Sequence, residues 1–116
     1  MVQVDIVEIK GHKSKSATDS LSKEGEKILR QTQSYTLLDQ TGREFTSPGF
    51  AGFLQAKGGG DFLIGGPYGV SNEIKDQAKD TIALSRMTFT HEMARVFFLE
   101  QLFRAMTIIH NKEYHH

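Results

Sequence analysis

The stretch FLIGGPYGVS, Phe62–Ser71, places three apolar residues directly before a glycine-rich turn and a serine after it. The apolar run predicts a buried strand, Phe62–Ile64, and Ser71 is placed to cap a helix that runs to about Asp80. A strand that stops at Gly-Gly-Pro and is followed by a helix leaves free backbone amides at its tip. Those amides could bind a ligand, or they could only turn the chain, and this stretch alone leaves both interpretations open.

The residues on either side continue the alternation of strands and helices. Upstream, the patterns predict a strand over Met1–Ile9, a polar loop over Gly11–Ser20, and a helix that is capped by Asp19 or Ser20 and reaches about Arg30. They then predict a strand SYTLLD (Ser34–Asp39), which the turn QTGRE closes. A short helix follows, capped by Ser47 and ended by GGGD (Gly58–Asp61). Downstream, they predict a strand TIALSRMTF (Thr81–Phe89) and a helix from His91 to about Asn111. This order predicts one α/β domain over residues 1–116, with a mostly parallel sheet flanked by helices.

The strand ends of this predicted sheet indicate where a ligand would bind. In an open parallel sheet, ligands bind beyond the carboxyl ends of the strands. Asp39, Gly65 and the segment Arg86–Phe89 would all lie at that edge. We therefore expect three loops to converge on one crevice.

Composition and charge exclude several kinds of protein. The 116 residues include 14 Lys plus Arg and 14 Asp plus Glu, so there is no global basic field, and any contact with nucleic acid must be local. The absence of cysteine excludes disulfides, thiolate metal sites and cysteine nucleophiles. With no leader pattern and no apolar run of the ~18 residues that a membrane span needs, we expect a soluble cytoplasmic protein that does not contact a membrane. The histidines lack metal-binding spacing and predict no metal site; they are His12, His91, His110, His115 and His116.

The last predicted helix carries more apolar residues than one face can hold. They are Met93, Val96, Phe97, Phe98, Leu99, Leu102, Phe103, Met106, Ile108 and Ile109. A surface helix buries a single face, so the surplus predicts a second subunit rather than a helix buried centrally in the monomer. Arg95 and Arg104 also lie on this helix, where a charge needs a partner or a substrate anion, although both, like Arg86, could be ordinary solvated charges.

The common enzyme signatures are absent from the sequence. GGPYG has neither the Lys and Ser/Thr of a P-loop nor the G-x-G-x-x-G spacing of a dinucleotide site. No serine lies in a nucleophile elbow, and no close carboxylate pair indicates glycoside hydrolysis. The residues by themselves therefore predict a fold, a crevice, a dimer and candidate anion-binding arginines, but no reaction.

A combination of spaced motifs carries a resemblance to a known family. In chain order these motifs are KEGEKIL, LLD at Leu37–Asp39, IGGPYG, ALSRMTFTHEMARVFFLEQLFRA and NKEYHH. Over nearly all of the chain they resemble the SPOUT class of RNA methyltransferases. Within that class they are similar to the subfamily that methylates ring nitrogen N3 of a pseudouridine in bacterial large-subunit (23S) ribosomal RNA.

The resemblance implies an α/β fold with a trefoil knot, a homodimer, and S-adenosylmethionine as the methyl donor. In the family the donor is held largely by backbone groups. The corresponding positions here are Leu38, Gly65, Leu84, Ser85, Arg86, Met87, Thr88 and Phe89. Gly65 and Gly66 would let the backbone come close to the donor, where a Cβ would intrude.

The resemblance also implies roles for residues of the last helix and the tail. Transfer needs mainly alignment of donor and acceptor, because the sulfonium already activates the methyl group. His91 is the candidate for assisting loss of the N3 proton, with helix capping or packing as open alternatives. Arg95 and Arg104 are candidates for binding RNA phosphate. Tyr114 and His115 match a Tyr-His tail that, in the family, reaches the active site of the partner subunit. The resemblance therefore makes Tyr114, His115 and Arg104 further catalytic candidates. His115 is also a candidate substrate contact. The implied substrate is ribosomal RNA in the assembled ribosome.

One departure from the family leaves a second hypothesis open. Family members usually begin with a further strand and helix before the strand that matches VQVDIVEI. Without that segment a sheet edge would be unprotected and part of the dimer contact would be missing. The alternative is therefore a noncatalytic SPOUT-fold protein that binds RNA or acts as a scaffold. The intact GGPYG and LSRMTF motifs favour the enzyme, because a scaffold does not require a tight glycine approach at that point.

Overall fold

The structure is a computed structural model, and it describes residues 17–66 and 69–114. The elements in chain order are α1 (Ala17–Gln31), β1 (Tyr35–Glu44), α2 (Ser47–Lys57), β2 (Asp61–Ile64), α3 (Asn72–Gln77), β3 (Asp80–Ala83) and α4 (His91–Tyr114). The predicted strand Met1–Ile9 lies outside the described residues. So does most of the predicted loop Gly11–Ser20, whose last residues already belong to α1.

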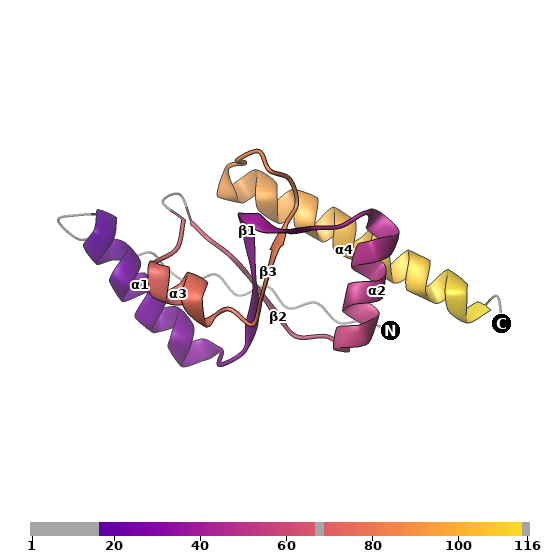
Figure 1. The fold of residues 1–116 in the computed structure, drawn as a ribbon, viewed down its shortest axis with the longest axis horizontal. Helices are drawn as coiled ribbons and strands as arrows, with labels where there is room; N and C mark the ends of the chain where they lie inside the picture. Colours follow the sequence, from indigo (N-terminus) through magenta and orange to yellow (C-terminus); the bar gives the residue numbers. More distant parts are fainter. Residues whose placement is uncertain (1–16, 67–68, 115–116) are drawn as a thin grey trace.

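The described strands form one parallel sheet in the order β2-β1-β3 (Figure 1). β1 is the central strand and pairs with β2 from Tyr35 to Leu38. The crossover from β1 to β2 contains α2, and the crossover from β2 to β3 contains α3, as parallel neighbours require. The prediction of a parallel α/β sheet flanked by helices is confirmed for these strands.

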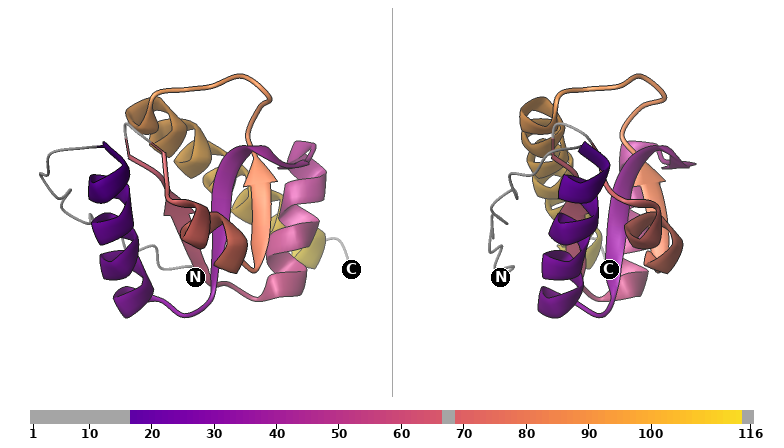
Figure 2. Two further views of the ribbon diagram at one scale, coloured as in Figure 1. Left: turned by 60° about the vertical axis from the view of Figure 1, so that its left-hand side comes forward. Right: turned by 90° about the vertical axis from the view of Figure 1, so that its left-hand side faces the viewer.

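Helices cover both faces of the sheet (Figures 1 and 2). α1 and α3 contact each other on one face, and α2 and α4 contact each other on the other. Alternate side chains of β1 reach the two faces. Tyr35 and Leu37 are buried with Ile28 and Ile74 beneath α1 and α3, whereas Leu38 packs into the cluster formed by α2 and α4. The sheet is therefore the middle layer of three.

The start of α2 differs from the prediction by one residue. Thr46 is the N-cap, because its side-chain oxygen accepts a hydrogen bond from the Gly49 amide at 3.1 Å. The predicted cap, Ser47, is wrong: its hydroxyl donates to Gln101 of α4 at 2.9 Å. The helix ends where GGGD predicts, because Gly58 adopts the left-handed φ of 75° typical of a helix C-terminus.

α3 is shorter than predicted. It follows the predicted cap Ser71, whose hydroxyl accepts a hydrogen bond from the Ile74 amide at 3.3 Å, but it ends at residue 77 instead of reaching residue 80. The helix stops early because the Lys79 amide donates to the Tyr35 carbonyl at 3.0 Å, which draws the chain into the sheet.

β3 is also shorter than the predicted strand TIALSRMTF. It ends at Ala83, and residues 84–90 form a loop that passes over the carboxyl end of the sheet to the start of α4 (Figure 2). The Ser85 hydroxyl accepts a hydrogen bond from the Met87 amide at 3.0 Å, a local bond that competes with strand pairing. The second half of the predicted strand therefore lies above the sheet.

β1 is longer than predicted, and its pairing with β3 is interrupted. The strand continues to Glu44, past the predicted turn QTGRE. Leu38 pairs with Ile82, and after an excursion of residues 39–42 Arg43 pairs with the same Ile82. The predicted turn thus coincides with an excursion inside the strand, not with its end.

α4 buries one side and exposes apolar residues on the other. Phe98 and Ala105 are buried in the core shared with α2. Phe103 is 76% exposed, Val96 55% and Met93 44%. The alternative of a helix buried centrally in the monomer is therefore wrong, and the predicted surplus of apolar surface is present.

Candidate functional site

A cavity of about 490 Å³ lies at the carboxyl ends of the three strands. Its walls come from the end of β1 and its excursion, from the turn after β2, and from the loop after β3 with the first turn of α4. The three loops converge as predicted. The predicted donor contacts that line this cavity are Leu38, Gly65, Gly66, Leu84, Ser85, Met87, Thr88 and Phe89.

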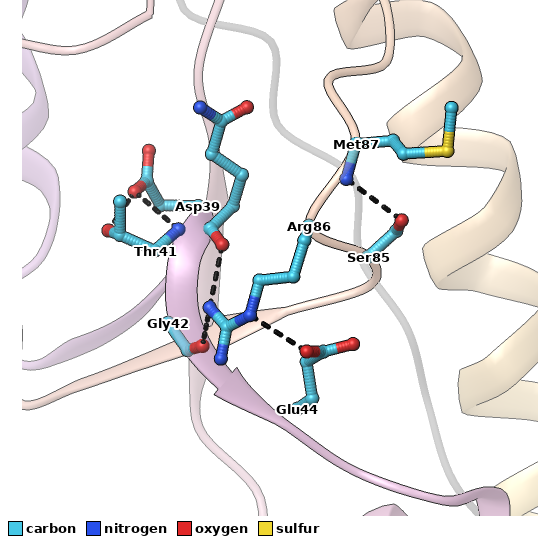
Figure 3. A network of polar contacts seen from close by, with 8 residues as sticks. Asp39, Thr41, Gly42, Glu44, Ser85, Arg86 and Met87 are labelled. Carbon is cyan, nitrogen blue, oxygen red and sulfur yellow. Dashed lines mark hydrogen bonds and ion pairs between the residues drawn. The ribbon is translucent and has the colours of Figure 1, made fainter.

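Asp39 is the carboxylate that the excursion of β1 brings to the cavity. Its Oδ2 accepts a hydrogen bond from the Thr41 hydroxyl and another from the Thr41 amide at 3.1 Å (Figure 3). The bond from the hydroxyl contributes most to a pKa for the Asp39 carboxyl below its ordinary value of 3.8, because it stabilises the charged form. Asp39 therefore presents a negative charge to the cavity at neutral pH.

The cavity wall is acidic where it carries charge. Among the described residues that line it, Asp39 and Glu92 are acidic and none is Lys or Arg. The other wall residues contribute the Gln40 amide, the His91 imidazole, hydroxyl and backbone groups, and apolar side chains. Such a wall favours a ligand with positive charge and disfavours a phosphate.

The glycines of the turn after β2 differ in the space around them. A Cβ on Gly65 would lie 3.1 Å from the Gly69 carbonyl carbon and 3.1 Å from a methyl of Val70, so the turn itself presses on this position. A Cβ on Gly65 would thus meet the backbone of the same turn, and the contact of Gly65 with a donor stays a prediction. A Cβ on Gly66 would come only within 3.7 Å of Glu24, so the expectation of a close ligand approach applies to Gly66.

Arg86 stands apart from the other predicted donor contacts, because it is absent from the cavity wall. Its Nη1 donates to the carbonyl of Gln40 at 2.8 Å and to that of Gly42 at 2.6 Å, and its Nε lies 2.7 Å from Oε1 of Glu44 (Figure 3). The guanidinium is thus directed at β1, and only the backbone of Arg86 is left to contact a donor.

His91 lies on the cavity wall as the first residue of α4, half-buried. The helix cap is Thr90, whose hydroxyl accepts a hydrogen bond from the Met93 amide at 3.3 Å and whose carbonyl accepts one from the Ala94 amide at 2.9 Å. The alternative that His91 caps the helix is therefore wrong. A role at the cavity stays a prediction.

Arg95 and Arg104 do not line the cavity. Arg104 forms an ion pair of 3.1 Å with Glu100 on the preceding helical turn, with both side chains more than half exposed. Helix geometry places Arg104 about 20 Å along α4 from His91, and it turns Arg95 and Arg104 to faces about half a turn apart. The two arginines therefore belong to separate surfaces.

The predicted tail residues lie at the far end of the same helix. Tyr114 is the last residue of α4, and its side chain is outside the described part; His115 lies wholly outside it. A helix of this length places Tyr114 about 35 Å from His91. The far end of α4 is thus well separated from the cavity at its start.

Residues that the sequence interpretation did not assign also line the cavity. Gln40, Thr90 and Glu92 do so because of the excursion of β1 and the position of the first turn of α4. The turn pattern QTGRE is the sequence signal for Gln40, but the pattern predicts the end of a strand and not an excursion inside it. Glu92 directly follows His91, so whether it lines the cavity depends on the direction in which α4 leaves the cavity wall.

The described residues contain no group of His, Cys, Asp or Glu that could hold a metal ion. No helix among them is long and apolar enough to cross a membrane.

A parallel α/β sheet with an acidic and apolar cavity at its carboxyl edge has the arrangement of the α/β proteins that bind small organic ligands at this edge. The family model described as a predicted SPOUT methyltransferase matches residues 1–115. The chain belongs to the SPOUT methyltransferase family.

Curated relatives agree with this assignment. The chain is 43% identical over 121 residues to a protein of Geotalea uraniireducens, with 97% of this chain and 79% of the relative covered. It is 47% identical over 112 residues to a protein of Cytophaga hutchinsonii, with 89% and 72% covered. It is 44% identical over 119 residues to a protein of Parabacteroides distasonis, with 96% and 76% covered. All three relatives are named ribosomal RNA large subunit methyltransferase H.

Proposed function

We propose that this protein transfers a methyl group from S-adenosylmethionine to N3 of a pseudouridine in large-subunit ribosomal RNA, and that its substrate is the assembled ribosome in the cytoplasm. The cavity at the carboxyl edge of the sheet is the observation that carries the proposal, because eight of the predicted donor contacts line it. The names of the relatives support ribosomal RNA as the methyl acceptor.

The cavity suits this donor in size and in charge. Its volume of about 490 Å³ is within the range of roughly 300–1,000 Å³ typical of small-molecule sites. S-adenosylmethionine would supply there a methyl group already activated by a sulfonium, and it carries an ammonium as well. The carboxylates of Asp39 and Glu92 complement positive charge, whereas a nucleotide phosphate would find no Lys or Arg among the described wall residues.

Residues of three loops would divide the work of binding and orientation. Leu38, Leu84 and Phe89 provide apolar surface, and the backbone of residues 65–66 and 84–89 provides hydrogen-bonding groups. His91, at the start of α4, lies on the same wall and is our candidate to accept the N3 proton of the acceptor base. The protein thus acts chiefly by alignment of donor and acceptor.

A homodimer would complete the site. The exposed apolar residues of α4 and the preceding loop include Met87, Met93, Val96 and Phe103, which a second copy would cover. Because the far end of α4 lies about 35 Å from His91, a tail with Tyr114 and His115 would act at the cavity of the partner rather than at its own. Arg95 and Arg104 would then bind RNA phosphate on two separate surfaces. The trefoil knot is also part of this proposal.

The test combines donor binding with methyl transfer. We expect calorimetric titration with S-adenosylmethionine to give about one site per chain, and we expect radiolabelled methyl transfer to whole ribosomes but weak transfer to free 23S RNA. Ribosomes whose large-subunit RNA lacks pseudouridine are the matched control, and they should accept no methyl group.

The outcomes separate the proposal from its alternative. Donor binding without transfer to any RNA would support a noncatalytic SPOUT-fold protein. Absence of donor binding would contradict the assignment of the cavity as the donor site. Transfer that is unchanged in ribosomes without pseudouridine would leave a methyltransferase but contradict the proposed target base.

A further inference from the structure

The cavity has two walls that belong to segments far apart in the sequence. One wall is formed by Leu38, Asp39 and Gln40, where β1 leaves the sheet. The other is formed by residues 84–85 and 87–90, in the loop that replaces the second half of the predicted last strand. Beyond Leu38, which still pairs with Ile64 and Ile82, neither segment has ladder pairing with β3, because β1 is unpaired with β3 over residues 39–42 and β3 ends at Ala83.

A single guanidinium connects these two segments. Arg86 belongs to the loop, and its Nη1 donates to the carbonyls of Gln40 and Gly42 at 2.8 and 2.6 Å. Its Nε pairs with Glu44 at 2.7 Å, where β1 has rejoined the sheet (Figure 3). One planar group therefore spans the excursion from its middle to its end. The hydroxyl of Thr88 adds a second link, donating to the side-chain oxygen of Gln40.

Close backbone packing beneath the excursion supports this arrangement. A Cβ on Gly42 would lie 2.6 Å from backbone atoms of Thr81 and Ile82 in β3, so the chain passes directly over that strand. Gly42, whose carbonyl Arg86 binds, thus also lies directly against the backbone of β3. Two of the contacts of Arg86 are thus with backbone carbonyls of the excursion, and the third is with the exposed side chain of Glu44.

From these contacts we propose that Arg86 is a positioning residue of the donor site. Its guanidinium holds the excursion of β1 against the loop of residues 84–90, and so fixes the separation of the two cavity walls before a donor binds. The inference rests on the proposed function, because the donor is the ligand whose affinity would depend on that separation. On this inference, the Arg86 side chain affects donor binding by holding β1 in position, and it does not contact the donor itself.

The test compares Arg86→Met and Arg86→Lys with a matched control, Arg43→Met. Arg43 is a cation on β1 whose guanidinium lies 4.6 Å over the Phe45 ring and outside the cavity wall. We expect Arg86→Met to raise the Kd for S-adenosylmethionine about tenfold, which corresponds to the loss of roughly one charge-assisted hydrogen bond. Arg86→Lys should restore binding only partly, since an ammonium lacks the planar fork of a guanidinium. Arg43→Met should leave the Kd unchanged.

Hydrogen exchange of the donor-free protein provides a readout that is independent of the donor. In Arg86→Met we expect faster amide exchange over residues 39–42 and 85–88 and unchanged exchange in α1 and α3. If the wild-type protein binds no donor, the proposed function fails while this exchange measurement still tests the link. Unchanged exchange in both segments, or equal losses of affinity in Arg86→Met and Arg43→Met, would overturn the inference.

Discussion

At the residue scale, Asp39 is the group whose chemistry most clearly suits the proposed donor. Its carboxylate lies on the cavity wall, and the Thr41 hydroxyl and amide fix its position. S-adenosylmethionine carries a sulfonium charge that its product S-adenosylhomocysteine lacks. A fixed negative charge on the wall can therefore help to distinguish the donor from the spent product.

We expect Asp39→Asn to weaken binding of S-adenosylmethionine about fivefold to tenfold, and binding of S-adenosylhomocysteine less. The matched control is Asp61→Asn, which removes the same charge at the start of β2, where the carboxylate accepts a hydrogen bond from Thr32. Calorimetric titration with both ligands measures the ratio of the two Kd values. The same ratio of Kd values in Asp39→Asn as in wild type would show that the Asp39 carboxylate does not distinguish the two ligands by charge.

The pH dependence of this effect follows from the pKa of the same carboxyl. The Thr41 hydroxyl lowers the pKa of Asp39 below 3.8 in the folded protein, so the charge is present above that value and is lost only as the pH falls through the folded-state pKa. The ratio of the Kd values of Asp39→Asn and wild type for S-adenosylmethionine should therefore be the same at about pH 6 and pH 8. A ratio that falls to one at pH 6 would contradict a charged Asp39 carboxylate at that pH.

At the scale of the elements, some helix ends follow from local residues, whereas the ends of β1 and β3 do not. The glycine end of α2 and the Ser71 cap of α3 follow from residues next to each other in the chain. The ends of β1 and β3 depend on their partners. β1 continues because Arg43 pairs with Ile82 after the excursion, and β3 stops where the loop with Arg86 binds β1 through the Gln40 carbonyl. Strand limits are therefore set by pairing, which no local pattern contains.

The N-cap of α2 gives a direct test of an element boundary. We expect Thr46→Ala to lower the free energy of unfolding by about 1 kcal/mol, because the Gly49 amide loses its side-chain partner. Ser47→Ala removes only the hydrogen bond to Gln101 and should cost less. Urea denaturation of the two variants measures the difference. A larger loss in Ser47→Ala would restore Ser47 as the cap.

At the scale of the whole molecule, the exposed apolar face of α4 is the main feature that the monomer leaves uncovered. We propose a second copy as its partner, and Phe103, at 76% exposed, is the most exposed of its large apolar residues. We expect Phe103→Glu to shift the protein from dimer to monomer in sedimentation velocity at micromolar concentration. Such a charge would have to be desolvated in the apolar contact.

The control for the dimer is Gln55→Glu on α2, which adds the same charge at another exposed helical position. It should leave the sedimentation coefficient unchanged. Circular dichroism should show the same helix content in both variants, since neither side chain is buried. A wild-type protein that sediments as a monomer, or a dimer that survives Phe103→Glu, would contradict the contact through this face.

The sequence by itself determined the order of the described elements, the parallel sheet and the edge at which the three loops converge. These follow from local apolar runs, capping residues and the rule that parallel strands need helical crossovers. The motifs LLD, IGGPYG and LSRMTF also pointed to the family that the family model then matched. Each of these signals is carried by residues that are close together in the chain.

The tertiary structure alone decided what each residue of the site faces. It turned the guanidinium of Arg86 toward Gln40 and Gly42 and away from the cavity wall, and it separated Arg104 from His91 along a rigid helix. It also placed the backbone of Gly69 next to the position of a Cβ on Gly65. The Arg86 contacts join residues 46 and 44 positions apart, and their direction is fixed by packing and strand register and not by the identity of neighbouring residues.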